Sequence, residues 1–145
     1  MQARHSTGGR VTRVDTIHLT LAFLGDTGAA RAEAAIAAAR RVRATRTALA
    51  IEQAAYWKHN RIVWVGPRET DPSLADALCA ELRAEGFMIE ARPFRAHVTL
   101  LRKAGPGPLP ELPPIDWPVH SFVLVRSELS AKGSAYRVVE EFALV

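Results

Sequence analysis

The chain has 145 residues, of which 48% are hydrophobic and 23% are charged, and this balance predicts one compact domain with a buried core. No uninterrupted apolar run approaches the ~18 residues of a membrane-spanning helix, so we expect no membrane segment. The formal charge of +4 is carried mainly by arginine, which mildly favours a nucleic-acid or nucleotide partner. Codon usage in a GC-rich genome explains the same composition equally well.

The N-terminal residues carry charges but no apolar segment of the signal-peptide type. Arg4 and Arg10 are followed by polar residues, so we expect a soluble, cytoplasmic protein. The single cysteine, Cys79, cannot form an internal disulfide. Because it lies among leucines at helical spacing, we predict a buried structural thiol.

The first predicted element is a strand over residues 17–25. Residues 1–15 before it are polar and predict an irregular lead-in. Within the strand, His18 and Thr20 stand where apolar side chains are expected. Because alternate side chains of a strand share a face, these two point to the same side.

A helix and a β-hairpin follow. Asp26 and Thr27 are candidate caps for a helix through Arg43, which has a thin apolar stripe between its arginines. The hairpin is predicted from strand-like residues 47–53, the aromatic pair 56–57, a turn at 58–60, a strand at 61–65, and an end at Gly66-Pro67.

The second helix has the clearest signals. Asp71 is its predicted N-cap, Pro72 its first residue, and Gly86 lies just past its end. After it, residues 87–91 favour a short strand, and residues 94–102 favour a second strand with a polar motif.

The C-terminal part reads as a loop and a hairpin. Five prolines within residues 105–114 exclude a helix or a sheet interior, so we expect a surface loop. Strands over 119–126 and 135–142 are joined by a tight turn at Lys132-Gly133. This element order predicts an α+β fold with antiparallel or mixed sheets, as a single domain over residues 1–145.

The tetrad His-x-Thr-hydrophobic occurs twice, at His18 and at His97-Val98-Thr99-Leu100. One tetrad is more often a half-buried structural pair, but two copies in a short chain indicate a shared role. We expect the two strands to form a polar floor beneath a phosphate, with one imidazole on either side. His18 and His97 are suited to acid and base work because the unperturbed pKa of histidine is near ~6.5.

Two other kinds of site fit less well. A zinc site lacks the H-x-x-x-H spacing, clustered Cys or acidic ligands and a third ligand that can be named, so we expect no metal and no cofactor. A serine nucleophile lacks the G-x-S-x-G elbow. Phosphoester cleavage, with threonine hydroxyls donating to phosphate oxygens, fits the residue types best.

With these motifs the chain resembles the two-histidine (2H) phosphoesterase superfamily, and within it the RNA 2′,3′-cyclic phosphodiesterases, once called 2′-5′ RNA ligases. The resemblance is carried by the segments His18 to Gly25, Arg61 to Gly66, Arg92 to Leu100, Ser127 to Leu129 and Tyr136 to Val138. It implies a two-lobed, pseudo-symmetric fold with helices packed outside and an active-site cleft between the lobes. It also implies metal-independent hydrolysis of RNA or oligonucleotide 2′,3′-cyclic phosphate ends to 2′-phosphates.

The resemblance implies roles for individual residues. His18 and His97 are the expected general acid and base, in an order left open, and Thr20 and Thr99 the expected phosphate-binding hydroxyls. The family's arginine, five residues after the second histidine, falls on Arg102. That residue has the opposite parity to His97 and reaches the site only through a bulge or at the strand's end, so Arg95 is the alternative.

Relatives begin with a strand and a helix before the first motif, roughly a thirty-residue unit, and we expect this chain to lack that N-terminal βα unit. A monomer is expected, or a dimer if the missing unit leaves a sheet edge uncovered. A non-catalytic RNA- or nucleotide-binding module on the same fold is the rival hypothesis.

The remaining candidate residues favour structural roles. We expect His5 in the terminus, His59 in a turn and His120 at a strand start. Among the aromatic residues, Trp64 is expected to pack within the sheet, and base stacking is left open for Trp57.

Overall fold

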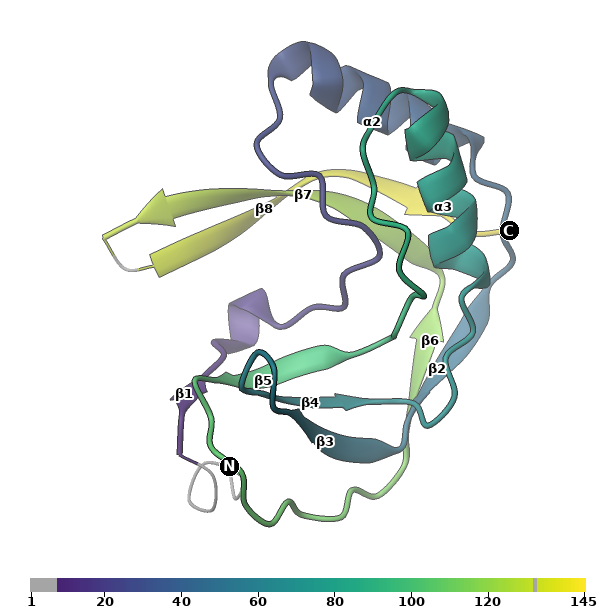
Figure 1. The fold of residues 1–145 in the computed structure, drawn as a ribbon. Helices are drawn as coiled ribbons and strands as arrows, with labels where there is room; N and C mark the ends of the chain where they lie inside the picture. The colour runs from purple at the N-terminus through teal and green to yellow at the C-terminus, as the bar shows by residue number, and fades with distance from the viewer. Residues whose placement is uncertain (1–7, 132) are drawn as a thin grey trace. The chain divides into compact units, whose positions relative to one another are not determined.

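Segments interleaved along the chain form two units in this computed structural model, which describes residues 8–131 and 133–145, with only the backbone of Ser130 (Figure 1). Unit 1 comprises, of the described residues, 8–19, 48–69 and 96–117, and unit 2 comprises 20–47, 70–95 and 118–145. The fold is α+β, as the sequence predicts. No helix of the described residues is long and apolar enough to cross a bilayer.

Unit 1 is built on a four-stranded sheet in the order β1-β5-β4-β3 (Figure 1). Its strands are β1 (Arg10–Val11), β3 (Gln53–Trp57), β4 (Ile62–Gly66) and β5 (Val98–Arg102), and each neighbouring pair is antiparallel. The β3–β4 hairpin with its turn after Trp57 confirms the predicted hairpin. His59 lies in this turn, as expected.

The strand β5 contains a bulge against β4. Val63 lies opposite Leu101 and Trp64 lies opposite Thr99, so Leu100 is an extra residue with no partner on β4. A bulge of this kind reverses the alternation of side chains beyond it. Val98 and Leu101 are both buried, at 5% and 0% exposure, although three positions apart, which is the pattern that the bulge produces.

One face of this sheet, here named the covered face, is packed against the proline-rich loop. Its buried residues are Val63, Leu101 and Ala104, with Val11, Tyr56 and Leu109 packed around them. The Tyr56 hydroxyl donates to the Ala104 carbonyl at 3.0 Å, which holds the chain beyond β5 against the hairpin. Hydrophobic burial on this face leaves the opposite face available for polar side chains.

The strand β2 (Thr47–Ile51) ends before Glu52 and pairs with β6 (Ile115–Val119), not with the hairpin. The prediction of one continuous strand over 47–53 was therefore wrong at its end, and β6 was not predicted because it contains Pro118. No regular structure occurs between β5 and β6, which confirms the proline-rich segment as a loop.

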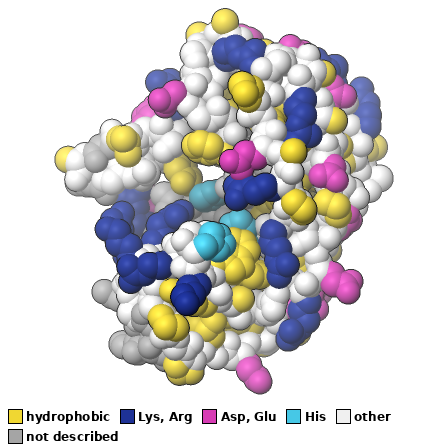
Figure 2. All heavy atoms as spheres, in the orientation of Figure 1, with side chains coloured by type: hydrophobic (Ala, Val, Ile, Leu, Met, Phe, Trp, Pro, Cys, Tyr) yellow, Lys and Arg dark blue, Asp and Glu magenta, His cyan; other side chains and the backbone are white. Residues whose placement is uncertain are grey.

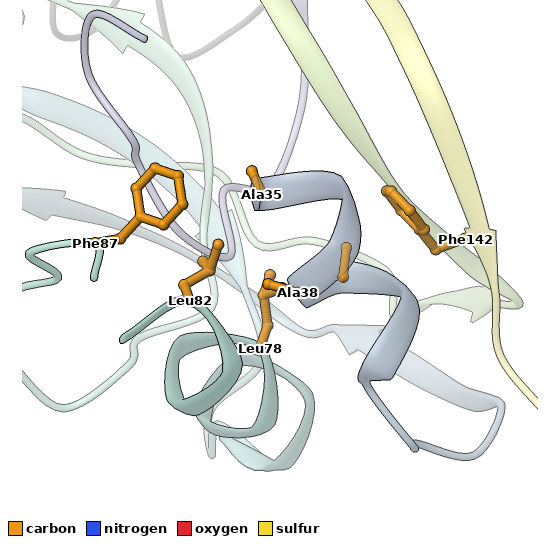
Figure 3. Packing of buried hydrophobic residues seen from close by; sticks show 7 residues of the cluster. Ala35, Ala38, Leu78, Leu82, Phe87 and Phe142 are labelled. Atoms are coloured by element: carbon orange, nitrogen blue, oxygen red, sulfur yellow. The ribbon is translucent and has the colours of Figure 1, made fainter. Parts of the chain in front are cut away.

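Unit 2 packs two helices and a long hairpin (Figures 1 and 3). Its elements are α2 (Ala29–Arg41), α3 (Ser73–Ala84), β7 (Ser121–Ser130) and β8 (Gly133–Ala143). The buried cluster, shown in Figure 3, consists of Ala35, Ala38, Ala39, Leu78, Leu82, Phe87 and Phe142. The small alanines of α2 let α3 and β8 approach closely, so this helix packs through backbone proximity rather than large side chains.

Charged pairs surround the cluster. Arg41 contacts Glu81 at 2.7 Å and Glu85 at 2.8 Å, linking α2 to α3, and these hydrogen bonds raise the pKa of the guanidinium. Arg40 contacts Glu140 of β8 at 2.8 Å. Because the arginines are exposed, the pairs fix the orientation of α2 more than they stabilise the fold.

The helix ends differ from prediction in their capping. The first helix begins after Gly28 with no side-chain cap, since Thr27 donates to the Gly25 carbonyl instead. Asp71 binds the backbone N–H and hydroxyl of Ser73, which lowers the pKa of its carboxyl, and α3 begins after Pro72, one residue later than predicted. Gly86, at φ +86°, ends α3 as expected.

Several sequence predictions were wrong in the irregular segments. The lead-in contains β1 and a 3-10 turn at Val14–Thr16, and residues 87–91 form no strand. The strand expected at 17–25 is reduced to a single bridge between Leu19 and Val98. On one side of this bridge β1 occupies the same β5 edge, with Thr12 N–H donating to the Leu100 carbonyl, and on the other side residues 91–97 form no strand with which residues 20–25 could pair.

The C-terminal hairpin is confirmed, and it is longer than predicted at both strands. Lys132 of its predicted turn lies outside the described residues. Cys79 is only partly buried rather than fully buried, and desolvation raises the pKa of its thiol, which keeps it protonated near neutral pH.

We predict that Leu82→Ala destabilises the protein by about 2–5 kcal/mol, because Leu82 is 3% exposed and its loss leaves a cavity between α2 and α3. Leu129→Ala is the matched control, since Leu129 is 88% exposed, and it should change the free energy of unfolding by less than about 0.5 kcal/mol. Urea denaturation followed by circular dichroism measures both. Similar losses in the two variants would contradict the assignment of this core.

Candidate functional site

The second predicted histidine and threonine lie at the start of β5. Thr99 pairs with Trp64 and is half-buried, and His97 comes directly before the strand. By alternation His97, Thr99 and Trp64 face the side of the sheet opposite Val98 and Leu101. We name this side the histidine face. Apolar residues of β4 and β5 thus form the covered face, and the residues that alternate with them along each strand point to the histidine face.

The bulge at Leu100 decides where Arg102 lies. Without it, Arg102 would have the parity of Val98 and would point to the covered face. With it, Arg102 follows Leu101 and returns to the histidine face, where its side chain is exposed. The sequence indicates that Arg102 can reach the side of His97 only through a bulge or at the strand's end, and this bulge meets that condition.

The first histidine comes to the same face through the bridge between Leu19 and Val98. This antiparallel pairing sets His18 across from Thr99 and diagonally across from His97. Diagonal neighbours of this kind are about 7–8 Å apart, with their Cβ atoms somewhat closer. Two imidazoles at this separation leave room for a tetrahedral anion between their inner edges.

A hydrogen bond fixes the protonation pattern of His18. Its Nδ1 lies 2.7 Å from the carbonyl oxygen of Thr16, at the end of the 3-10 turn. A carbonyl only accepts, so Nδ1 donates the proton, and the neutral ring carries its lone pair on Nε2. The ring is exposed, and its Nε2 is therefore the nitrogen suited to exchange a proton with a substrate.

Aromatic rings surround His97. Its ring centroid lies 4.6 Å from that of Trp57, with the planes at 61°, and 6.3 Å from that of Trp64. The two indole centroids are 4.8 Å apart, so Trp57 at the end of β3 and Trp64 in the middle of β4 form one packed group. Trp64 is 1% exposed, which confirms its packing role, while half-buried Trp57 borders the histidine directly.

A close backbone approach holds the segment that carries His97. A Cβ added at Gly66 would lie 2.7 Å from the Ala96 carbonyl oxygen and 3.1 Å from the Trp64 ring. Ala96 itself is 3% exposed. The position of His97 thus depends on a glycine at the end of β4.

The structure brings His18, His97, Thr99 and Arg102 to one face of unit 1. Thr20 and Arg95 belong to unit 2, and both are exposed. His120, before β7, also belongs to unit 2 and is exposed. The predicted phosphate-binding roles of the two threonines and of either arginine stay predictions.

The viewed surface of the molecule carries histidine side chains together with Lys and Arg side chains, as Figure 2 shows in cyan and dark blue. Such a surface attracts anions. In residues 8–131 and 133–145, no group of three or more His, Cys, Asp or Glu side chains is placed to hold a metal ion.

Sequence reasoning missed two residues of this site. Gly66 was read only as the end of a hairpin, and Trp57 was left open between packing and stacking. Their roles follow from the pairing of β4 with β5, which places residues distant in sequence beside His97. The one signal in the sequence is a glycine directly after a buried strand, which indicates close backbone approach.

The chain is similar in sequence and in fold to known proteins. Residues 1–64 match the family described as LigT like Phosphoesterase. The chain is 33% identical over 141 residues to RNA 2′,3′-cyclic phosphodiesterase of Escherichia coli K12, covering 94% of this chain and 80% of that protein. It is 32% identical over 141 residues to the Thermotoga maritima protein of the same name, covering 88% of this chain and 75% of that one. The crystal structure of E. coli LigT complexed with 3′-AMP aligns with a TM-score of 0.84 at 32% identity, over 94% of this chain and 82% of that chain.

We predict that Gly66→Ala displaces the Ala96–His97 segment, because the new methyl group must push the Ala96 carbonyl away. Overpacking of this kind costs about 1–3 kcal/mol of unfolding free energy. The His97 imidazole signal, assigned in NMR spectra through a His97→Gln variant, should shift.

Gly28→Ala is the control, since its added methyl meets nothing within 4 Å. This variant should leave the His97 signal in place. An unshifted signal in Gly66→Ala would show that Gly66 does not position the histidine.

Proposed function

This chain belongs to the LigT-like phosphoesterase family, and we propose that it hydrolyses 2′,3′-cyclic phosphate ends of RNA or oligonucleotides to 2′-phosphates without a metal ion. The observation that carries the proposal is the presence of two imidazoles on one face of unit 1, set by the Leu19–Val98 bridge. The names of the relatives from E. coli and T. maritima supply the substrate class.

In the proposed reaction one imidazole takes a proton from a water molecule, and the oxygen of that water attacks phosphorus. The bond from phosphorus to the 3′ oxygen breaks, and the other imidazole, in its charged form, gives a proton to that oxygen. A 2′-phosphate and a free 3′-hydroxyl result, with atoms and charge balanced. Both steps suit groups that gain and lose protons near neutral pH.

Negative charge grows on the non-bridging phosphate oxygens during this attack. Thr99 lies on the histidine face, across from His18 and two residues along β5 from His97, and its hydroxyl is suited to donate to one of these oxygens. Thr20 is proposed to do the same from the first motif. Arg102, returned to this face by the bulge, is proposed to add a charged donor, and charge-assisted bonds of this type are the stronger ones.

The packing around His97 also serves this reaction. Trp57 and Trp64 confine the ring, so little conformational freedom is lost when the phosphate binds.

We predict that His18→Ala and His97→Ala each lower kcat/KM on a cyclic-ended oligonucleotide by about 10²-fold or more, since each removes one proton-transfer group. The assay contains EDTA, and chromatography identifies the product as a 2′-phosphate. His120→Ala is the control and should keep the rate of the natural protein.

Two outcomes would overturn the proposal. Rates like those of the natural protein in either histidine variant would remove that residue from the mechanism. Binding of cyclic-ended RNA by a folded sample without any product would favour the rival, a binding module.

We predict that Arg102→Gln lowers kcat/KM by about 10²-fold, the size of effect expected when a charged donor to a developing oxyanion is lost. Arg95→Gln should have a much smaller effect, because strand pairing sets Arg102 on the histidine face, whereas Arg95 lies before β5 in a segment without strand pairing. Steady-state kinetics of both variants on the same substrate measure the difference. The reverse order of effects would assign the phosphate to Arg95.

A further inference from the structure

A second arginine lies next to Arg102 on the histidine face. Arg10 of β1 pairs directly with Arg102 of β5, and directly paired residues point to the same side of a sheet. Both side chains are exposed. Their Cβ atoms are therefore about 5 Å apart, with both guanidinium groups directed to the side that carries His97 and Thr99.

Within the described part of the chain these two like charges are not compensated. Among the described residues neither Arg10 nor Arg102 forms an ion pair or a side-chain hydrogen bond. Asp15, the nearby acidic residue of the same segment, pairs with Arg13 at 3.3 Å. Directly opposed like charges destabilise a sheet, so this arrangement is one that an anion would stabilise.

The backbone fixes this juxtaposition. Gly9 has φ +93°, and a Cβ there would lie 2.8 Å from the carbonyl oxygen of Arg102. Only glycine permits such an approach together with that φ value. The short strand β1 is thus held tightly against the end of β5, and this pairing fixes the backbone of Arg10.

From this we infer that Arg10 forms a second phosphate subsite, which binds the phosphodiester on the 5′ side of the nucleotide whose cyclic phosphate lies at the histidines. The inference rests on the proposed function and narrows its substrate to an oligonucleotide, since a cyclic mononucleotide has no such phosphodiester. One arginine then serves each of two successive phosphates. Two paired guanidinium groups match the charges of two neighbouring phosphates better than the charge of a single phosphate.

The test compares 2′,3′-cyclic AMP with a tetra-adenylate that ends in a 2′,3′-cyclic phosphate. Arg10→Gln should lower kcat/KM for the tetra-adenylate about tenfold more than for cyclic AMP, mainly through KM. The plot of log kcat/KM against log salt concentration for the tetra-adenylate should become shallower by about 0.7, the value for one lost phosphate contact on a single strand.

Two further variants make the comparison specific. Arg68→Gln removes one exposed positive charge from unit 1 away from β1, and it should not change the ratio between the substrates. Arg10→Lys keeps the charge and should restore most of the discrimination. Circular dichroism confirms that each variant is folded.

The outcomes separate this inference from the proposed function. Equal losses on the two substrates, or an equal change of ratio in Arg68→Gln, would overturn the second subsite while leaving the hydrolysis in place. Absence of hydrolysis of both substrates by the natural protein would instead overturn the proposed function, and the subsite with it.

Discussion

One extra residue in β5 determines how the site is arranged. The strand must bury Val98 and Leu101 on the covered face and direct Thr99 and Arg102 to the other, and a regular strand cannot do both. The bulge at Leu100 reconciles these requirements. Bulges near functional sites commonly redirect a side chain in this way. Here the bulge that keeps Leu101 buried on the covered face also directs Arg102 to the histidine face.

The position of His97 depends on contacts from three elements. The segment before β5 passes over Gly66, and the indoles of Trp57 and Trp64 border the ring. Because packed interiors transmit small displacements, a methyl group at Gly66 is felt at the imidazole. On the histidine face His18 and Arg102 are therefore exposed, while half-buried His97 rests on a tightly packed layer of aromatic and backbone atoms.

Features set by local chemistry were predictable from the sequence. The helix α3 has Asp71, Pro72 and Gly86 near its ends, and the β3–β4 and C-terminal hairpins have alternating strands with recognisable turns. Features that depend on distant partners were not predictable. The strand expected around His18 is a single bridge because β1 occupies β5 on one side of it and residues 91–97 form no strand on the other, and no local pattern reveals either.

The candidate site divides in the same way. Its two histidines were identified from a repeated motif, which needs no structure. The return of Arg102 to their side was stated only as a condition, and the pairing of β4 with β5 meets that condition. The neighbours Trp57, Gly66 and Arg10 act through contacts across strands, so the sequence contained no pattern that joined them to the motif.

The single bridge at Leu19 has a consequence for motion. His97 adjoins a strand with partners on both edges, whereas His18 is anchored by one bridge and by the hydrogen bond to Thr16. Local opening of a segment costs less free energy when fewer contacts must break. Displacement of the His18 segment is therefore expected to cost less free energy than displacement of β5, so the two imidazoles of the proposed acid–base pair differ in the stiffness of their supports.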